Sequence, residues 1–382
     1  MAKVINTLSL YKFFDDFIVA YPLYAVMFAD NGLSLAQIST LFFAWSFTAF
    51  ILEIPSGVLA DKYDRKSILI LGQIIRIIGF CIWLLFPTFW GFLIGFIFCG
   101  IKSAFTSGTF EAYIYDYLKS KNSDSQFAKY FGKIKSFSFL AILLSAIGAS
   151  VLPQGNYLVV LIVSISALII STIAAIYLPR AEKIKSTGET RYFKLLKKGL
   201  NSVIRKKELM MALAFLSIVV GFMAVDEYLS LYAVNVGLSP KFLGILLAIY
   251  ATVQALASLF AHRVKPVKGI ISYIILLIFG TLLLVLGLMT NILGLIVWLL
   301  LATVSAYIIV IGEQNLQDAA DSEVRATVSS VKGFSAELLS LSVFVFFSTS
   351  SDSGLFRGMA LLGIVVISIS VLLILWKLKT KL

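Results

Sequence analysis

Residues 57–69 read G-V-L-A-D-K-Y-D-R-K-S-I-L and lie between two long apolar runs. The charged residues of this stretch are Asp61, Lys62, Asp64, Arg65 and Lys66. Because so many neighbouring charges cannot remain in hydrocarbon, the stretch must lie at a membrane surface. It therefore predicts a short polar turn between two membrane-spanning helices.

The composition of the chain also indicates a membrane protein. Of its 382 residues, 60% are hydrophobic and 14% are charged, whereas a soluble domain is about 45–50% apolar and about 25% charged. The first apolar run already contains Asp15 and Asp16. We therefore expect no cleavable signal peptide and a first helix that stays in the protein.

The net charge of +12 does not indicate nucleic-acid binding, because the basic residues are scattered among short loops instead of forming one basic face. Cys81 and Cys99 lie inside apolar runs and His262 is the single histidine, so we expect neither a disulfide nor a zinc site. The sequence has no G-x-x-x-x-G-K-S/T motif. We therefore expect the energy for any transport to come from an ion gradient and not from ATP, and we expect neither a cofactor nor a metal.

Apolar runs recur along the whole chain. A hydrocarbon core of about 30 Å requires about 20 helical residues, and twelve runs reach that length. The predicted transmembrane helices are 8–29, 36–60, 67–88, 90–118, 127–151, 156–178, 208–234, 240–261, 269–289, 291–318, 325–349 and 355–376. When alternate loops are assigned to opposite sides, one side carries nearly all the Lys and Arg residues, and the other carries only Lys241 and Arg357. This pattern predicts a plasma-membrane protein with both termini in the cytoplasm.

A long polar segment, 179–207, divides the predicted helices six and six. A short repeat crosses this segment, because N-G-L-S-L-A-Q-I-S at 31–39 is similar to V-G-L-S-P-K-F-L-G at 236–244. We therefore predict an all-α membrane protein with 12 transmembrane helices in two pseudo-symmetric six-helix bundles. The predicted domains are 1–178 and 208–382, joined by a basic cytoplasmic linker at 179–207.

The stretch at 57–69 resembles the loop between the second and third helices of the major facilitator superfamily, which is written G-x-L-A-D-R-x-G-R-K-x-x-L. Asp64 stands where the family has its second glycine, and the matching residues are Gly57, Leu59, Ala60, Asp61, Arg65, Lys66 and Leu69. The resemblance implies a secondary transporter that works by alternating access and is not an enzyme, nearest to the drug and metabolite efflux permeases.

The same resemblance implies that this loop is a conformational latch, with Asp61 and Arg65 in the latch positions. The complete set of predicted latch residues is Glu53, Gly57, Asp61, Arg65, Lys66 and Asp116. The alternative is a basic loop that only fixes the topology.

Two signatures of the drug-antiporter branch of the family are absent. When Gly100 is aligned with the branch's glycine, Phe96 stands at the position of its arginine. The helix predicted at 127–151 has S-A-I-G-A-S at 145–150 instead of G-P-x-x-G-G. The resemblance therefore extends to the superfamily but not to the antiporter branch.

Charged residues inside the predicted helices are candidate functional residues, because each costs at least about 2.5–3.5 kcal/mol on insertion scales. Asp15 and Asp16 point about 100° apart on a helix. We favour Asp16 as the one that faces a central cavity and exchanges a proton there, and the alternative is an ion pair with Lys12. Lys102 needs a carboxylate partner, for which Asp16 and Glu111 are the candidates; a buried structural pair is the alternative.

The other candidates are polar residues along the same helices. The predicted proton-coupling or substrate-cavity residues are Asp16, Lys102, Glu111, Glu313 and Glu337, and the possible substrate contacts are Tyr21, Tyr24 and Asn315. Asp226 and Glu227 lie toward the outer end of a predicted helix, so we expect them to be solvated.

The function predicted from the sequence is proton-coupled efflux of lipophilic or cationic small molecules, drugs included, by a monomer in the lipid bilayer. Its partners would be the small-molecule substrate and a proton or another ion. The alternative is ion-coupled uptake or release of a nutrient, metabolite or siderophore. A channel would not need the latch, and an enzyme would need a catalytic set that one histidine cannot supply, so both are remote alternatives.

Overall fold

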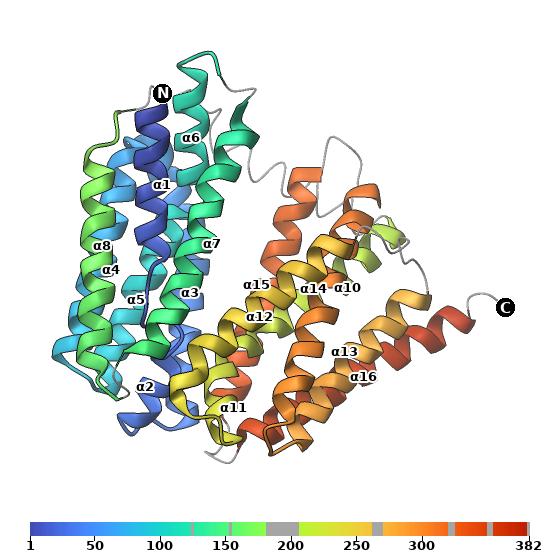
Figure 1. The fold of residues 1–382 in the computed structure, drawn as a ribbon. Coiled ribbons are helices and arrows are strands. Elements are labelled where there is room, and N and C mark those ends of the chain that lie inside the picture. Colours follow the sequence, from blue (N-terminus) through green and yellow to red (C-terminus); the bar gives the residue numbers. More distant parts are fainter. Residues whose placement is uncertain are drawn as a thin grey trace. The chain divides into compact units, whose positions relative to one another are not determined.

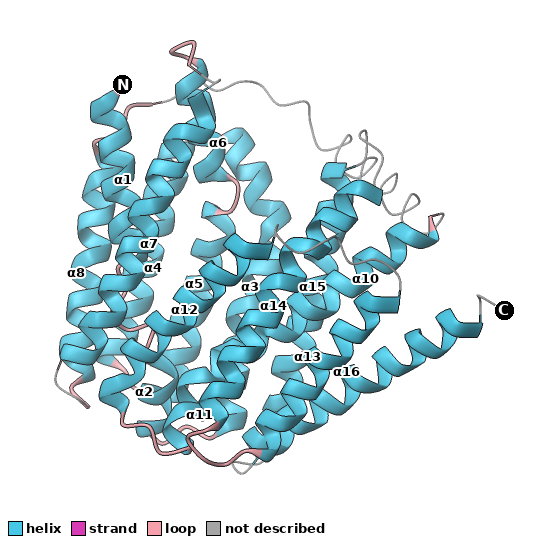
Figure 2. Cartoon of the chain, turned by 45° about the vertical axis from the view of Figure 1, so that its right-hand side comes forward, coloured by secondary structure: helices cyan, strands magenta, loops and turns pink. Residues whose placement is uncertain are grey.

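The structure is a computed structural model, and it describes residues 1–123, 126–152, 155–180, 206–261, 270–319, 325–349 and 354–379. These residues form helices joined by loops and turns, and no strand occurs among them (Figure 2). Within the same residues, eleven helices are long and apolar enough, by length and composition, to cross a membrane. The prediction of an all-α chain is confirmed.

The helix predicted at 8–29 is not continuous. It is divided into α1 (Ala2–Asp16) and α2 (Tyr24–Asp30), so the prediction of one unbroken span was wrong. The physical reason is Pro22, which lacks a backbone N–H and disfavours the helical conformation in Tyr21 before it. Each piece alone is too short to cross a bilayer.

The break between α1 and α2 is stabilised by neighbouring helices. The backbone N–H of Ala20 donates to the hydroxyl of Ser164, at 3.1 Å, on α8 (Tyr157–Ile176). The backbone carbonyl of Asp15 accepts from Arg76 Nη1, at 2.9 Å, on α4 (Arg65–Leu85). Since an unsatisfied backbone group is costly away from water, these two side chains make the break tolerable.

The helix predicted at 90–118 is also divided, into α5 (Phe89–Thr106) and α6 (Thr109–Lys119). Gly108, at the break, has φ +68°, a left-handed conformation that glycine adopts without strain. The apolar run continues through this position, so hydrophobicity alone predicted one helix.

By their contacts, Met1–Leu33, Thr40–Thr187 and Ser239–Ala248 form one compact unit, called unit 1. In unit 1, α1 packs against α7 (Phe127–Val151) and α8, and α4 packs against α5 and α8 (Figure 1). Part of its core is aromatic: the ring centroids of Phe28 and Phe92 are 4.5 Å apart, and those of Trp83 and Phe96 are 4.9 Å apart. Most of α3 (Leu35–Lys62) also belongs to this unit.

Unit 2 consists of Ser34–Ser39, Gly188–Leu238 and Ile249–Leu382. The helix predicted at 208–234 has three parts here: α10 (Lys207–Phe222), a 3₁₀ segment η2 (Met223–Tyr228) and α11 (Leu229–Asn235). The 3₁₀ turn η3 (Pro240–Phe242) and the start of α12 (Leu243–Phe260), up to Ala248, belong to unit 1, and the rest of α12 belongs to unit 2. The following helices of unit 2 are α13 (Ile270–Leu288), α14 (Gly294–Ala319), α15 (Arg325–Ser348) and α16 (Gly354–Lys379). α10 packs against α14 and α15, and α13 packs against α14 and α16.

The contact between α13 and α16 depends on glycine. A Cβ added at Gly363 on α16 would overlap the backbone nitrogen of Leu284 on α13 and lie 2.8 Å from the carbonyl oxygen of Gly280. Small residues allow two membrane helices to approach so closely. Gly363 is therefore a packing residue of unit 2.

Candidate functional site

The stretch at 57–69 forms the end of α3, a turn of two residues and the start of α4, as the charges predicted. Asp64 is the N-cap of α4, where its carboxylate accepts from the backbone N–H of Ser67 at 3.3 Å and from the Ser67 hydroxyl at 3.1 Å. Its φ of −64° suits any residue. An aspartate therefore replaces the family's glycine here because this turn uses a side-chain cap.

Arg65 and Lys66 join α4 to other helices of unit 1. Arg65 Nη1 forms an ion pair with the carboxylate of Asp116 on α6 and donates to the carbonyl of Ala112 at 2.9 Å. Lys66 Nζ donates to the carbonyl of Ile176, at 2.6 Å, where α8 ends. Three predicted latch residues thus tie α4 to α6 and α8.

The structure gives less support for the other predicted latch residues, Glu53, Gly57 and Asp61. The side chain of Glu53 on α3 is exposed. The side chains of Gly57 and Asp61 lie outside the described residues, although the backbone of α3 is described through both positions. The latch therefore stays a prediction.

The ion pair between Arg65 and Asp116 carries a testable prediction. Their side chains are 13% and 5% exposed, so removing one partner leaves a poorly solvated charge. We expect Asp116→Asn to lower the free energy of unfolding by about 3 kcal/mol, measured as the unfolding midpoint of the purified protein in detergent. The double variant Arg65→Leu/Asp116→Leu, which removes both charges of this pair, is expected to recover part of the loss. Unchanged stability of Asp116→Asn would contradict the prediction.

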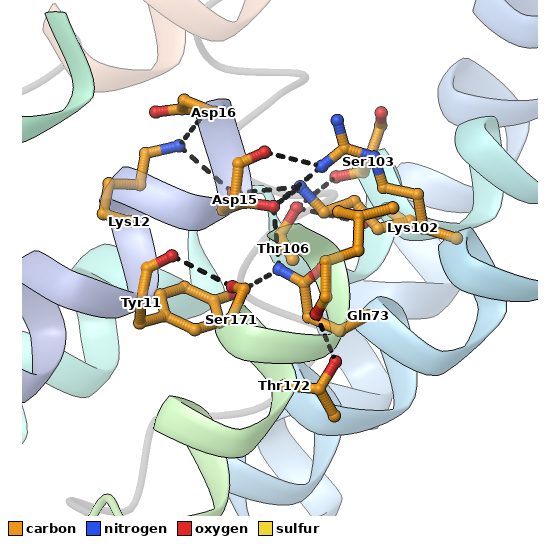
Figure 3. Close-up of polar contacts among 12 residues, drawn as sticks. Tyr11, Lys12, Asp15, Asp16, Gln73, Lys102, Ser103, Thr106, Ser171 and Thr172 are labelled. Carbon is orange, nitrogen blue, oxygen red and sulfur yellow. Dashed lines mark hydrogen bonds and ion pairs between the residues drawn. The ribbon is translucent and has the colours of Figure 1, made fainter. Parts of the chain in front are cut away.

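Among the described residues of unit 1, an extensive polar cluster surrounds Asp15, at the end of α1 (Figure 3). Its Oδ1 atom lies 2.8 Å from Arg76 Nη1 on α4 and 2.8 Å from Lys102 Nζ on α5. The same oxygen accepts from Gln73 Nε2 at 2.7 Å, and Oδ2 lies 3.3 Å from Lys12 Nζ. One carboxylate thus holds donors from three helices.

Arg76 has further partners around the helix break. Its Nη2 atom donates to the hydroxyl of Tyr21, and its guanidinium carbon lies 5.3 Å from the centroid of the Tyr21 ring. Asp15 and Arg76 are both 3% exposed and Gln73 is fully buried, whereas Tyr21 is 45% exposed. The cluster is therefore buried at Arg76 and reaches the surface of unit 1 at Tyr21.

Asp16 lies on another side of α1. Its Oδ1 atom is 2.9 Å from Lys12 Nζ, and its Oδ2 atom accepts from the hydroxyl of Ser138 on α7. The ion pair with Lys12 is the alternative that the sequence left open. We refer to Lys12, Asp15, Asp16, Arg76 and Lys102, with Gln73 and Tyr21, as the Asp15 network.

The structure changes the partner expected for Lys102. The sequence offered Asp16 or Glu111, but Lys102 binds Asp15. The rotation of α1 turns Asp15 toward α4 and α5 and Asp16 toward α7, whereas Glu111 lies half-buried in the first turn of α6. That rotation depends on how the helices pack and is not visible in the sequence.

Sequence reasoning missed Gln73 and Arg76. A signal was present, because the two polar residues are three positions apart in a helix that is otherwise apolar and therefore share one face.

Tyr24, a predicted substrate contact, packs among aromatic rings, with its centroid 5.7 Å from that of Phe42 and 5.9 Å from that of Phe96.

In unit 2, the predicted residues Glu313 and Asn315 are half-buried on α14, and Glu337 is half-buried on α15. Glu313 forms an ion pair with Lys332 on α15, at 2.9 Å, and accepts from Gln317 Nε2 at 2.9 Å. The carboxylate of Glu313 therefore links two helices of this unit.

Asp226 and Glu227, which the sequence predicted to be solvated, are half-buried in η2. The Tyr250 hydroxyl on α12 donates to Asp226 and itself accepts from Gln254 Nε2 at 2.8 Å. The indole nitrogen of Trp298 on α14 lies 3.4 Å from Asp226 Oδ1. The structure thus assigns Asp226 a set of neutral donors that the sequence did not predict.

The family profile of the Major Facilitator Superfamily matches residues 8–345. The chain belongs to the major facilitator superfamily. This assignment confirms the resemblance carried by 57–69 and the prediction of a multi-span membrane protein. As a member of this superfamily, the protein is a transporter and not an enzyme.

This superfamily member also matches two curated proteins over part of its length. It is 28% identical over 156 residues to the uncharacterized transporter BU466 of Buchnera aphidicola, a match that covers 41% of this chain and 39% of the relative. It is 30% identical over 93 residues to the uncharacterized MFS-type transporter MJ1560 of Methanocaldococcus jannaschii, which covers 24% of each protein. The chain thus matches well under half the length of these relatives.

Solved structures of other transporters share its fold over nearly the whole chain. The nucleoside transporter NupG has a TM-score of 0.74 at 14% identity and covers 98% of both chains. The POT family transporter PepTSo has a TM-score of 0.76 at 11% identity and covers 100% of this chain and 99% of its own. At these identities the likeness establishes the fold alone.

Proposed function

We propose that this protein is a proton-coupled secondary active transporter that moves small organic molecules out of the cell. The observation that carries the proposal is the Asp226 carboxylate, held inside unit 2 by the neutral donors of Tyr250 and Trp298. Among the described residues no Lys or Arg forms an ion pair with it. An ionised carboxylate without a cation is costly in hydrocarbon, and a bound proton removes that cost. Asp226 is therefore our candidate for the coupling proton.

The Asp15 network supports a separate role in substrate recognition. Charged residues inside membrane helices are costly, and they mark substrate and ion pathways in transporters. Asp16 and Lys102, two candidates from the sequence, belong to this network. We keep Glu111, Glu313 and Glu337 as further candidates for lining the path.

We also propose the topology and the latch. The distribution of Lys and Arg supports cytoplasmic termini for a chain in the cell membrane. The contacts of Arg65 and Lys66 with α6 and α8 support a latch, because they tie the stretch at 57–69 to helices far from it in sequence.

Two substrate classes remain as proposals. Lipophilic cations are supported by the aromatic rings of Tyr250 and Trp298 beside Asp226, since such rings attract cations. A specific metabolite, the alternative, is supported by the fold shared with NupG, which is named a nucleoside transporter. The same experiment tests both classes.

The experiment uses everted membrane vesicles with an established proton gradient and a pH-sensitive dye. Lipophilic cations, organic acids, nucleosides and peptides are added one at a time, and a substrate is expected to dissipate the gradient. We expect Asp226→Asn to reduce that dissipation by about tenfold or more, since the coupling proton would lose its acceptor. Asp318→Asn, which removes an exposed carboxylate of α14, is the matched control and should act as wild type. Full coupling in Asp226→Asn would refute the role of Asp226, and silence with every compound would refute proton-coupled export.

A further inference from the structure

The Asp15 network carries more positive than negative charge. Lys12, Arg76 and Lys102 supply three positive charges, and Asp15 and Asp16 supply two negative charges, so the sum is 3 − 2 = +1. Excess charge in a poorly solvated site is costly unless an opposite charge joins it. The composition of the network therefore favours one additional anion.

The contacts of Asp15 show how an anion is held there. A single carboxylate oxygen is within 2.7–2.8 Å of Gln73 Nε2, Arg76 Nη1 and Lys102 Nζ. Three donors from two helices converge on one point, the geometry that charge-assisted hydrogen bonds to an oxyanion require. The donors are suited to any oxyanion that replaces Asp15 at that point.

A buried polar atom in the same place gives an independent indication. The side-chain oxygen of Gln73 has no hydrogen-bond partner within the described residues, although Gln73 is fully buried. A buried acceptor without a donor is costly. A molecule that brings a hydroxyl or N–H group next to its oxyanion would satisfy this atom as well.

The network is open to the surface of unit 1 on one side. Tyr21 is 45% exposed while its hydroxyl contacts Arg76. The side chains of Lys12, Asp16 and Lys102 are 18%, 20% and 12% exposed. Tyr21 is therefore the residue of the network that is most exposed to an incoming molecule.

We propose that the Asp15 network binds the oxyanion of the transported molecule, a carboxylate or a phosphate. The oxyanion takes Lys102 and Arg76 as partners in exchange for Asp15, which is the internal competitor, and the ring of Tyr21 lies beside it. The inference rests on the proposed transport function and selects organic anions over lipophilic cations as its substrates.

The test measures binding without a proton gradient, so that it is independent of coupling. The purified full-length protein is heated in detergent with benzoate, phenyl phosphate, benzyl alcohol or benzyltrimethylammonium, and the unfolding midpoint is followed against concentration. These probes share one ring and differ in charge. Benzoate or phenyl phosphate should raise the midpoint, and which of them binds more tightly separates a carboxylate site from a phosphate site. A protein that neither anion stabilises, or that the alcohol or the cation stabilises equally, would overturn the proposal.

Two variants are expected to change the affinity for the anion in opposite directions. Lys102→Gln should weaken binding of the anion by about tenfold or more, because one charge-assisted hydrogen bond is lost. Asp15→Asn should strengthen it by about tenfold, because the internal competitor loses its charge. Lys133→Gln removes an exposed cation of unit 1 whose Nζ atom donates to Asn6 Oδ1 at 2.9 Å, outside the Asp15 network, and it should bind as wild type. Equal weakening in Lys102→Gln and Lys133→Gln, or weaker binding in Asp15→Asn, would contradict the proposal.

The outcome is separable from that of the transport experiment. Anion binding without export in vesicles would refute the proposed transport and leave the anion site standing. Export of lipophilic cations without anion binding would refute the anion site alone.

Discussion

Replacing Arg76 with glutamine is expected to destabilise the protein by about 3–5 kcal/mol, the loss typical of a buried ion pair that is left with one partner. Arg76 has three contacts that glutamine cannot reproduce together: the Asp15 carboxylate, the Asp15 carbonyl at the end of α1, and the Tyr21 hydroxyl. The variant thus loses an ion pair and the donor that satisfies the backbone carbonyl at the end of α1. The measurement is the unfolding midpoint, and the equilibrium free energy of unfolding, of the purified protein in detergent.

Two control variants make the Arg76 experiment decisive. Arg76→Lys keeps the charge but lacks the planar guanidinium group, which can donate to several acceptors at once. Its stability should therefore lie between those of wild type and Arg76→Gln. Arg357→Gln removes an exposed arginine of α16 and should change the free energy of unfolding by no more than about 0.5 kcal/mol. If Arg76→Gln unfolds at the midpoint of Arg357→Gln, the assigned role of Arg76 is wrong.

A loss of stability is also expected at Gly363, where even one methyl group does not fit. Gly363→Ala places a carbon against the backbone nitrogen of Leu284. Backbone cannot rotate away as a side chain does, so α13 and α16 must separate. We expect a loss of about 2 kcal/mol in the free energy of unfolding, within the range for overpacked sites.

The control for this experiment lies in the same unit. A Cβ added at Gly333, in the interior of α15, meets no atom within 4 Å. Gly333→Ala should therefore stabilise the protein by about 0.5–1 kcal/mol, since alanine is the better helix former. Destabilisation by Gly333→Ala as large as that by Gly363→Ala would show that close packing of α13 and α16 is not the cause.

Much of the fold follows from the sequence because the bilayer restricts the possibilities. Runs of about 20 apolar residues must be helices, and the charges at 57–69 had to lie in a turn. The breaks beside Pro22 and at Gly108 were not predicted, since the apolar runs continue through both. Each break depends on partners elsewhere in the chain, such as Ser164 for the first.

The candidate site was less predictable. Lys102 was singled out because an intramembrane charge needs a partner, but that partner is Asp15 and not Asp16, a difference set by the rotation of α1. Arg76 was missed although its spacing from Gln73 indicated a shared polar face. Asp226 was misjudged because its place near a helix end suggested solvent, whereas η2 turns it toward Tyr250.

The division of the first helix also has a consequence for how the protein is made. α1 carries Lys12, Asp15 and Asp16 within about its last turn and a half, and each such charge costs about 2.5–3.5 kcal/mol when a helix centre enters the bilayer from the translocon. The compensating cations, Arg76 and Lys102, belong to segments that the ribosome makes later. Within α1, Lys12 can offset only one of the two carboxylates, so we expect the end of α1 to settle stably in the lipid only after synthesis has passed Lys102. Membrane insertion of unit 1 would then be a joint event of several helices.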